Sequence, residues 1–336
     1  MQLQKKYNVT DMFKLVMAFI VIGIHVGAAF EVNYHPILIS VMETAVPFFF
    51  ICSGFFLQNK IIESRNYQYT LKNYFMKILR LYILWHLLYL PLYLKYMWTN
   101  EHSFFEDLKY CTHMFLFVGE IYFSWPLWYL HGLLISIIII YLLRKVRLSM
   151  ISIWVISLIM MLIGYFISEI IKSNDKTILY FVCQKIVDLL GTADRNGPFR
   201  GFTLVSTGMI IRQYHYKINK GIAVGSILIG FSFIMNMYSM PFSLVCSGGG
   251  LFIFSASLKV KNHPIYATLR THSILIYFMH MYFIVMCHML FKDIIINVQL
   301  VYYAWGGIFF INWTLAIIIE KLRRHNEYKW LNLFIG

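Results

Sequence analysis

The sequence predicts an all-α polytopic membrane protein, and both its composition and its segment lengths lead to this fold class. Hydrophobic residues make up 60% of the 336 residues and charged residues only 13%, whereas roughly a quarter of the residues of a soluble domain are charged. Apolar segments recur at the length that a helix needs to cross a bilayer, roughly 20 residues. We expect about ten such helices, over residues 12–30, 37–57, 76–97, 126–143, 150–171, 198–211, 222–239, 241–258, 273–291 and 300–319. The sixth and eighth are the weakest, because one is short and Gly248, Gly249 and Gly250 interrupt the other.

The basic residues predict the orientation of these helices. The net charge of +14 does not indicate a nucleic-acid partner, because most Lys and Arg residues fall on segments that alternate to one side, as the positive-inside rule requires of the cytoplasmic side. These residues are Lys5, Lys6, Lys14, Lys60, Arg65, Lys72, Lys77, Arg80, Arg144, Lys145, Arg147, Arg212, Lys217, Lys220, Lys259, Lys261, Arg270, Lys321, Arg323, Arg324 and Lys329. Both termini are therefore expected in the cytoplasm.

A single integral-membrane domain is expected over residues 1–336, because no segment between the apolar runs is long enough for a soluble catalytic domain. The stretch 99–125 is polar and aromatic, and residues 178–190 have the pattern of an amphipathic helix on the outer membrane surface. The sequence shows neither a Gly-rich phosphate loop behind a strand nor Cys and His residues at metal-site spacing. Any chemistry is therefore expected within the helices or at their ends, and no bound metal is expected.

The first apolar segment carries two ionisable residues on one side of a helix. His25 follows Lys14 by eleven positions, which places both residues on one stripe, about 16 Å apart. An ionisable group inside a membrane helix is costly and is therefore a candidate for function. The alternative is a histidine that packs against a neighbouring helix.

Glu43, in the second segment, is expected at a depth similar to that of His25, because each lies a few residues inside the outer end of its helix. A carboxylate beside an imidazole fixes the tautomer of the ring and raises its basicity. Glu43 is therefore a candidate to orient His25, and contact with interfacial water is the alternative.

Lys77 and Arg80 open the third segment and share a helical face with Asn73. Two cations at the cytoplasmic end of a membrane helix would attract a polyanionic ligand. The alternative is that both side chains extend to anionic lipid headgroups.

Two groups of residues are predicted near the outer side. Trp128 and Tyr129 belong to an aromatic belt that marks the outer interface. Arg195 and Asn196 lie beside a Gly-Pro turn, where a polar ligand that arrives from outside would meet them. Both groups are candidates to bind an acceptor substrate or to serve the structure.

The ninth segment places Ser273, Tyr277 and His280 on one helical face, with His280 near the middle of the membrane. A histidine at this depth needs a partner or a cavity. Tyr277 and His280 are therefore further candidates for acceptor binding or for structure.

These motifs together resemble the acyltransferase family 3 membrane proteins, from the first segment to the tenth. The motifs are Lys14-x10-His25, Val46-Pro47-Phe48-Phe49-Phe50 through Ser53-Gly54-Phe55, Lys77-x-x-Arg80, Leu127-Trp128-Tyr129-Leu130 and Ser273-x-x-x-Tyr277-x-x-His280. The run Arg195-Asn196-Gly197-Pro198-Phe199 with Gly208 is similar to the branch with surface-polysaccharide O-acetyltransferases and the membrane half of vancomycin-resistance serine racemases.

The resemblance implies a multi-pass enzyme of the bacterial cytoplasmic membrane. Its co-substrate would be cytoplasmic acyl-CoA, expected to be acetyl-CoA, with no permanently bound cofactor, and its acceptor a hydroxyl of a cell-envelope glycan or a lipid-linked sugar. His25 would be the catalytic histidine, and Lys14, Lys77 and Arg80 would serve the donor. Because Lys14 and Lys77 stand where the family often has Arg, bidentate recognition of a phosphate is weaker here.

Three alternatives stay open. His25 either acts as a general base on the acceptor hydroxyl or forms a covalent acyl-histidine. A transporter of a small polar solute, such as an amino acid, is the second class of function, and it would use interrupted helices. A non-catalytic membrane scaffold or sensor is the third.

Overall fold

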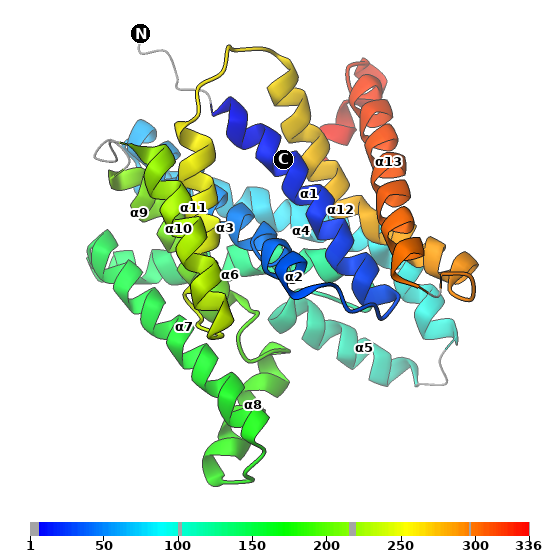
Figure 1. The fold of residues 1–336 in the computed structure, drawn as a ribbon, viewed down its shortest axis with the longest axis horizontal. Coiled ribbons are helices and arrows are strands. Elements are labelled where there is room, and N and C mark those ends of the chain that lie inside the picture. Colours follow the sequence, from blue (N-terminus) through cyan, green and yellow to red (C-terminus); the bar gives the residue numbers. More distant parts are fainter. Residues whose placement is uncertain (1–6, 100–102, 215–219, 296, 336) are drawn as a thin grey trace. The chain divides into compact units, whose positions relative to one another are not determined.

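The computed structural model describes residues 7–99, 103–214, 220–295 and 297–335, and within these ranges the chain is helical without a β-strand (Figure 1). The predicted all-α class is therefore confirmed. Seven helical segments of this part of the chain are long and apolar enough to cross a membrane. They are α1 (Asn8–Ala29), α2 with α3 (Pro36–Ser64), α4 (Tyr67–Thr99), η2 with α6 (Trp125–Lys145), α7 (Met150–Ser173), α12 (Ile265–Phe291) and α13 (Val298–Leu322).

The sixth, seventh and eighth predicted segments are helical but shorter. They form α9 (Phe202–Tyr214), which follows the π-helical turn η3 (Gly197–Gly201), α10 (Gly221–Met237) and α11 (Ser243–Ser257). Because these helices are shorter than a full span, the count of ten crossings and the cytoplasmic position of both termini stay predictions. Lys5, Lys6 and Lys217, which contribute to the charge bias, lie outside the described residues.

The segments between the long helices are also largely helical. α5 (Phe104–His113) and η1 (Met114–Val118) occupy the stretch after α4, and η5 (Asn326–Phe334) follows α13. α8 covers Ile178–Leu190, the range predicted for an amphipathic helix. It begins after Thr177, whose hydroxyl accepts a hydrogen bond from the N–H of Tyr180 at 3.2 Å. A capping residue in the sequence therefore sets this helix start.

The second predicted segment is divided at Glu43. α2 (Pro36–Met42) ends at this residue, and α3 (Ala45–Ser64) begins two residues later. Pro47 explains the break, because a proline has no N–H for the carbonyl four residues earlier, that of Glu43, and its ring clashes with that carbonyl. Glu43 therefore lies at the end of a helix and not inside a continuous one.

Contacts between Cα atoms divide the chain into two compact units. The first unit consists of Met1–Phe49 and Lys217–Gly336, and the second of Phe50–Tyr216. Polar residues of the predicted site fall in both units, with His25, Glu43 and His280 in the first and Lys77, Arg80 and Arg195 in the second.

In the first unit, α1 packs along α12 and α13, and α10 packs along α11 (Figure 1). Trp305 of α13 joins α1: its indole N–H donates to the carbonyl oxygen of Phe19 at 2.7 Å, and its ring stacks on that of Phe19 at 4.7 Å. α10 and α11 approach closely at Gly225 and Gly250, because a Cβ atom on Gly225 would lie 2.7 Å from the carbonyl oxygen of Gly250. Small residues allow such close packing of membrane helices.

In the second unit, α6 contacts α4, α9 and η3. α3 crosses α9 where both helices carry a glycine. A Cβ atom on Gly54 would overlap the carbonyl oxygen of Val205, and one on Gly208 would overlap that of Ile51. Gly54 and Gly208 of the sequence motifs therefore serve the packing of two helices.

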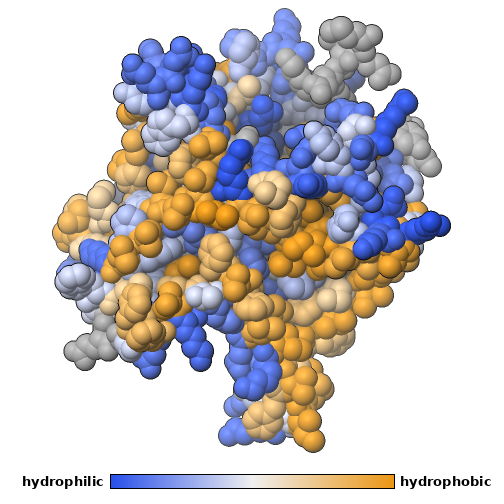
Figure 2. All heavy atoms as spheres, turned by 180° about the vertical axis from the view of Figure 1, so that it is seen from behind, coloured by the Kyte–Doolittle hydropathy of each residue, from blue (hydrophilic) through white to orange (hydrophobic). Residues whose placement is uncertain are grey.

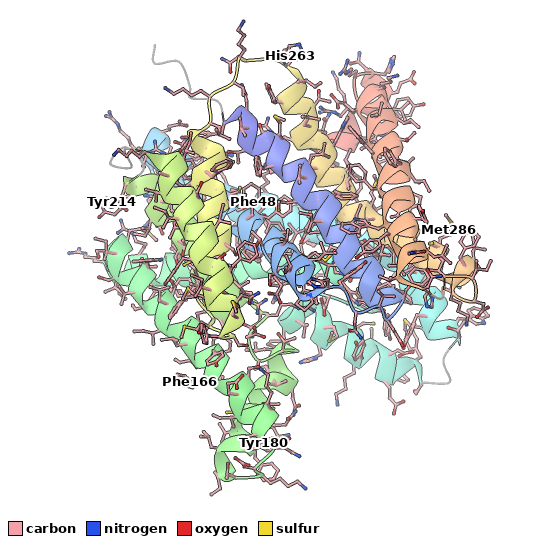
Figure 3. All side chains as sticks on the ribbon, in the orientation of Figure 1. Phe48, Phe166, Tyr180, Tyr214, His263 and Met286 are labelled. Atoms are coloured by element: carbon pink, nitrogen blue, oxygen red, sulfur yellow. The ribbon has the colours of Figure 1, made fainter. Side chains whose placement is uncertain are left out.

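Large apolar side chains lie on the surface as well as inside. Figure 2 shows extensive hydrophobic areas on the face that it presents. Phe166 of α7 is 59% exposed, whereas Phe48 of α3 is fully buried (Figure 3). Apolar areas of this extent are uncommon on soluble monomers, and lipid covers them in a multi-pass membrane protein.

Candidate active site

Two histidines from different helices stack against each other in the first unit. His25 lies near the end of α1 and His280 in the second half of α12; their ring centroids are 5.2 Å apart and the ring planes differ by 27°. His25 is 8% exposed and His280 is fully buried. The structure therefore brings together two residues that the sequence placed in separate motifs.

The hydrogen bonding of His280 defines its tautomer. Its Nδ1 lies 3.1 Å from the carbonyl oxygen of Ile276, and a carbonyl oxygen can only accept, so Nδ1 carries the proton. Its Nε2 is buried without a hydrogen-bond partner among the described residues. In the neutral ring, Nε2 therefore presents an unused lone pair inside the protein.

Aromatic residues also lie beside His280. The Tyr277 ring meets the Phe49 ring edge-on at 5.2 Å and the His280 ring at 6.3 Å. Tyr277 is 4% exposed. Ser273, one turn earlier, is also buried, and its hydroxyl donates to the carbonyl oxygen of Arg270 at 2.8 Å. The predicted face of α12 is thus an inner face of this unit.

A cluster of charges lies near the start of α1. Lys14 forms an ion pair with Asp11 at 2.9 Å, and the guanidinium of Arg270 in α12 approaches the other carboxylate oxygen of Asp11 at 3.7 Å. The Asp11 and Lys14 side chains are 10% and 12% exposed, whereas that of Arg270 is 54% exposed. Arg270 was absent from the predicted site, because its proximity to Lys14 depends on the packing of two helices far apart in the sequence.

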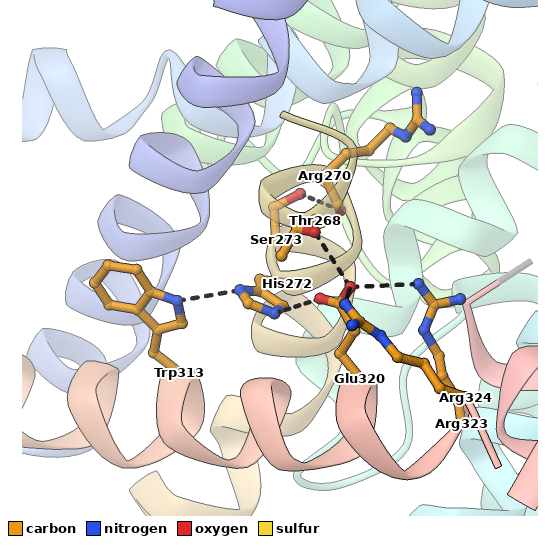
Figure 4. A network of polar contacts seen from close by, with 8 residues as sticks. All are labelled: Thr268, Arg270, His272, Ser273, Trp313, Glu320, Arg323 and Arg324. Atoms are coloured by element: carbon orange, nitrogen blue, oxygen red, sulfur yellow. Dashed lines mark hydrogen bonds and ion pairs between the residues drawn. The ribbon is translucent and has the colours of Figure 1, made fainter. Parts of the chain in front are cut away.

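Just beyond this cluster, a buried carboxylate joins α12 to α13 (Figure 4). Glu320 accepts hydrogen bonds from Thr268 and Arg324, each at 3.2 Å, and its second oxygen lies 2.7 Å from Nε2 of His272. The Trp313 indole donates to Nδ1 of His272 at 3.2 Å, so His272 carries its proton on Nε2, toward Glu320. This network fixes the first half of α12, the helix that carries His280.

The described hydrogen-bond partner of Glu43 lies on α10. The amide of Asn236 lies 3.4 Å from a carboxylate oxygen of Glu43 and 2.7 Å from the hydroxyl of Ser40. The predicted pairing of Glu43 with His25 stays a prediction.

Lys77 and Arg80 belong to the second unit. Lys77 is half-buried and lines an open pocket of about 490 Å³ at the start of α4. Lys60, Asn73 and Tyr74 also line it, and Arg80 is exposed one turn further along the helix. Glu63 adds a carboxylate to the two lysines of this lining, and the binding of an anionic ligand by Lys77 and Arg80 stays a prediction.

The outer candidates of the second unit are engaged with neighbouring residues. The Arg195 guanidinium pairs with Glu120 at 3.1 Å and lies 5.6 Å from the Trp128 ring. Asn196 is 2% exposed and caps η3 by accepting from the N–H of Phe199 at 3.0 Å. Burial raises the pKa of the Glu120 carboxyl, although Arg195 opposes this shift. No pattern in the sequence indicates Glu120, which lies 75 positions from Arg195.

Tyr129 also has a partner inside the second unit, since its hydroxyl lies 2.7 Å from that of Ser53 in α3. Its ring meets the Phe50 ring edge-on at 4.7 Å.

Among the described residues, no group of three or more His, Cys, Asp or Glu side chains could hold a metal ion.

Comparison with known proteins agrees with this architecture. A family profile described as an acyltransferase domain, that of acyltransferase family 3, matches residues 9–320. A protein named amino-acid racemase from Enterococcus faecalis is 29% identical over 150 residues, which cover 43% of this chain and 20% of the racemase. The match thus spans about a fifth of that relative's length, and no solved structure matches the chain.

Proposed function

The chain belongs to acyltransferase family 3, and we propose that it is a multi-pass membrane enzyme that moves an acyl group from acyl-CoA to a sugar hydroxyl. The expected donor is cytoplasmic acetyl-CoA. The expected acceptor is a cell-envelope glycan or a lipid-linked sugar on the outer side of a bacterial cytoplasmic membrane, whose lipid covers the exposed apolar side chains.

The observation that carries this proposal is the arrangement of α1 and α12. Lys14 and Arg270 share Asp11 near the starts of the two helices, and His25 and His280 stack further along both. Eleven and ten residues along a helix correspond to about 16 Å and 15 Å. In both helices, therefore, the cation and the imidazole are separated by a similar distance along the helix. A long substrate with an anionic head and a reactive thioester end requires such a separation between the group that binds the head and the group that reacts.

In the proposed reaction, His25 acts as the general base. It takes the proton of the acceptor hydroxyl while the oxygen attacks the thioester carbonyl carbon. The carbon–sulfur bond breaks, the ester forms, and the proton passes from the His25 imidazolium to the departing CoA thiolate. In the covalent variant, the neutral His25 ring attacks the thioester carbon, the carbon–sulfur bond breaks, an acyl-histidine forms, and the ring proton passes to the CoA thiolate. The acceptor hydroxyl then attacks this acyl group, the carbon–nitrogen bond breaks, the ester forms, and the hydroxyl proton returns to His25.

His280 supports this role of His25 through its tautomer. The Ile276 carbonyl fixes the His280 proton on Nδ1, so in its neutral form His280 offers Nε2 as an acceptor beside a ring that becomes positively charged during transfer. A second positive charge at a ring-to-ring distance of 5.2 Å would oppose the protonation of His25.

The donor would be held by its phosphates. Lys14 and Arg270 of the first unit are suited to this task, since each is cationic and they share one carboxylate. Lys77 and Arg80 of the second unit are proposed as donor residues on the basis of their motif.

Transport of a small polar solute is the rival class, and it predicts an interrupted helix at Gly248–Gly250. α11 instead runs continuously from Ser243 to Ser257. Gly248 and Gly250 serve packing, because a Cβ atom on Gly248 would lie 2.8 Å from the Cβ of Pro47 and one on Gly250 would lie 2.9 Å from the carbonyl oxygen of Gly225.

Purified protein in proteoliposomes tests the proposed function. Labelled acetyl-CoA and envelope glycan from cells that lack the gene are supplied on opposite sides of the membrane. We expect label on the glycan, dependent on intact His25. Uptake of labelled L-serine into the vesicles, without acetylated glycan, would contradict the proposal.

A further inference from the structure

A small polar pocket in the first unit lies between α2, α10 and α11. Its polar lining, called here the serine pocket, consists of Ser40, Glu43, Ser232, Asn236, Ser243 and Ser247, with Phe233 and Leu244 beside them. Its volume is about 10 Å³, close to the smallest space that holds one water-sized group. The pocket can therefore receive a single hydroxyl group but not a whole sugar ring.

Most oxygen atoms in the serine pocket are arranged as acceptors. The hydroxyls of Ser232 and Ser247 donate to the carbonyl oxygens of Ile229 and Leu244, at 2.7 and 3.3 Å. A hydroxyl that has donated its only proton can still accept. Together with the Glu43 carboxylate, these oxygens favour a ligand group that donates a hydrogen bond.

Two groups in the serine pocket have capacity left for a ligand. Ser243 is 6% exposed and lines the pocket, and a serine hydroxyl can both donate and accept a hydrogen bond. Glu43 receives one long contact, from Asn236 at 3.4 Å to one of its oxygens. Glu43 is an exposed residue, so its carboxylate can meet a ligand that arrives from outside the protein, and a hydrogen bond to a charged group is among the stronger ones.

The break between α2 and α3 produces this arrangement. Because Pro47 ends the hydrogen-bonding pattern at Glu43, the carboxylate lies at a helix end, where the Asn236 amide connects it to Ser40. Asn236 lies near the end of α10 and Ser243 begins α11. The predicted topology puts these two helix ends on the outer side, where the acceptor arrives.

We propose that the serine pocket seats a hydroxyl group of the acceptor, next to the one that is acylated, and so selects polyhydroxylated acceptors. This inference rests on the proposed function. It gives Glu43 a role in acceptor recognition that differs from the orientation of His25.

Kinetics of three variants test the proposal, with envelope glycan from cells that lack the gene as the acceptor. Ser243→Ala should raise the half-saturating glycan concentration about fivefold, and Glu43→Gln about tenfold or more, because a hydrogen bond to a charged group is the stronger one. The kcat and the half-saturating acetyl-CoA concentration should stay near wild type. Ser257→Ala is the matched control, since Ser257 is also in α11 but donates to Ile253 and does not line the pocket.

A binding measurement separates the pocket from the catalytic step. Ser243→Cys is labelled with a small thiol reagent, and mass spectrometry of the peptide gives its rate. Envelope glycan should slow this labelling several-fold, and L-serine at equal concentration should not. Protection by glycan in a protein that transfers no acetyl group would refute the proposed function while supporting the serine pocket.

The inference is overturned if glycan gives no protection and the half-saturating glycan concentration is unchanged in Ser243→Ala and Glu43→Gln, while the wild type still transfers acetyl groups. Stronger protection by L-serine than by glycan would also overturn it. A fall in kcat alone for Glu43→Gln would assign this carboxylate to His25 and not to the pocket.

Discussion

The loop at Arg195 and the stacked histidines of α1 and α12 were both predicted from sequence as polar sites, but they use their polar atoms differently. In the loop, Arg195 pairs with Glu120 and Asn196 caps η3. In the histidine pair, Nε2 of His280 is buried without a partner among the described residues. The difference teaches that a polar residue is a stronger candidate for chemistry when the fold leaves some of its hydrogen-bonding capacity unused.

The largest expected effect is at the histidine pair. His25→Ala should lower kcat by about 10²- to 10⁴-fold, the usual contribution of a general base. Binding of acetyl-CoA, measured directly by calorimetry, should stay near wild type, because the base acts only during transfer. A wild-type kcat in this variant would mean that the stacking serves packing alone.

Donor variants should give a smaller effect of another kind. Arg80→Ala, Lys77→Ala, Lys14→Ala and Arg270→Ala should each raise KM for acetyl-CoA by about tenfold, because each removes a charged contact to phosphate, and kcat should be largely kept. Lys145→Ala, an exposed lysine at the end of α6, is the control. A loss of kcat with unchanged KM and unchanged protein yield would contradict the assignment of these residues to the donor.

At the loop, we expect loss of stability and not of chemistry. Asn196→Ala removes the cap of η3 and should cost about 1 kcal/mol of stability. Asn196→Ser, which keeps a capping oxygen, should recover most of it. Thermal unfolding in detergent gives the stability, and the transfer rate per folded molecule should not change. A large fall in that rate would place the acceptor at the loop.

The smallest effect concerns Glu120. Because burial raises the pKa of its carboxyl above the ordinary value of 4.5, the folded state favours the protonated form. The stabilisation is complete below pH 4.5 and is lost as the pH rises through the raised pKa. Glu120→Gln stays uncharged, so its stability relative to wild type should improve over this pH interval, as thermal unfolding at several pH values can show. If the stability of Glu120→Gln relative to wild type fell with rising pH, the proposed effect of burial on the Glu120 carboxyl would be contradicted.

Sidedness can be tested at Cys111, a free thiol of α5 that is expected outside the cytoplasm. Burial raises the pKa of this thiol, so a membrane-impermeant maleimide should label it slowly in intact spheroplasts and faster at higher pH. Labelling only after lysis would reverse the predicted orientation.

Local patterns in the sequence predicted the helices well. The apolar segments are helical, and α8 has the predicted ends because Thr177 caps it within the local sequence. The break between α2 and α3 at Glu43 was not predicted, although Pro47, which causes it, is visible in the sequence. The number of membrane crossings stays a prediction, because a crossing is predicted from the length of an apolar helix and α9, α10 and α11 are short.

The site was predicted in part. Lys14, His25, Tyr277 and His280 were named from spacing and motifs, but spacing within one helix cannot show which other helix faces it. Arg270 and Glu120 were therefore missed, as each meets its partner only through packing of distant segments. The partner of Glu43 was missed for the same reason, since Asn236 follows it by 193 positions.

The most direct test of the central claim is the mass of the envelope glycan from cells that express the wild type, His25→Ala or Asn196→Ala in place of the native gene, at matched protein amounts. We predict a mass increase of one acetyl group per modified sugar with the wild type and with Asn196→Ala, and none with His25→Ala. Acetylated glycan from His25→Ala cells, or its absence from Asn196→Ala cells with normal protein amounts, would contradict the account.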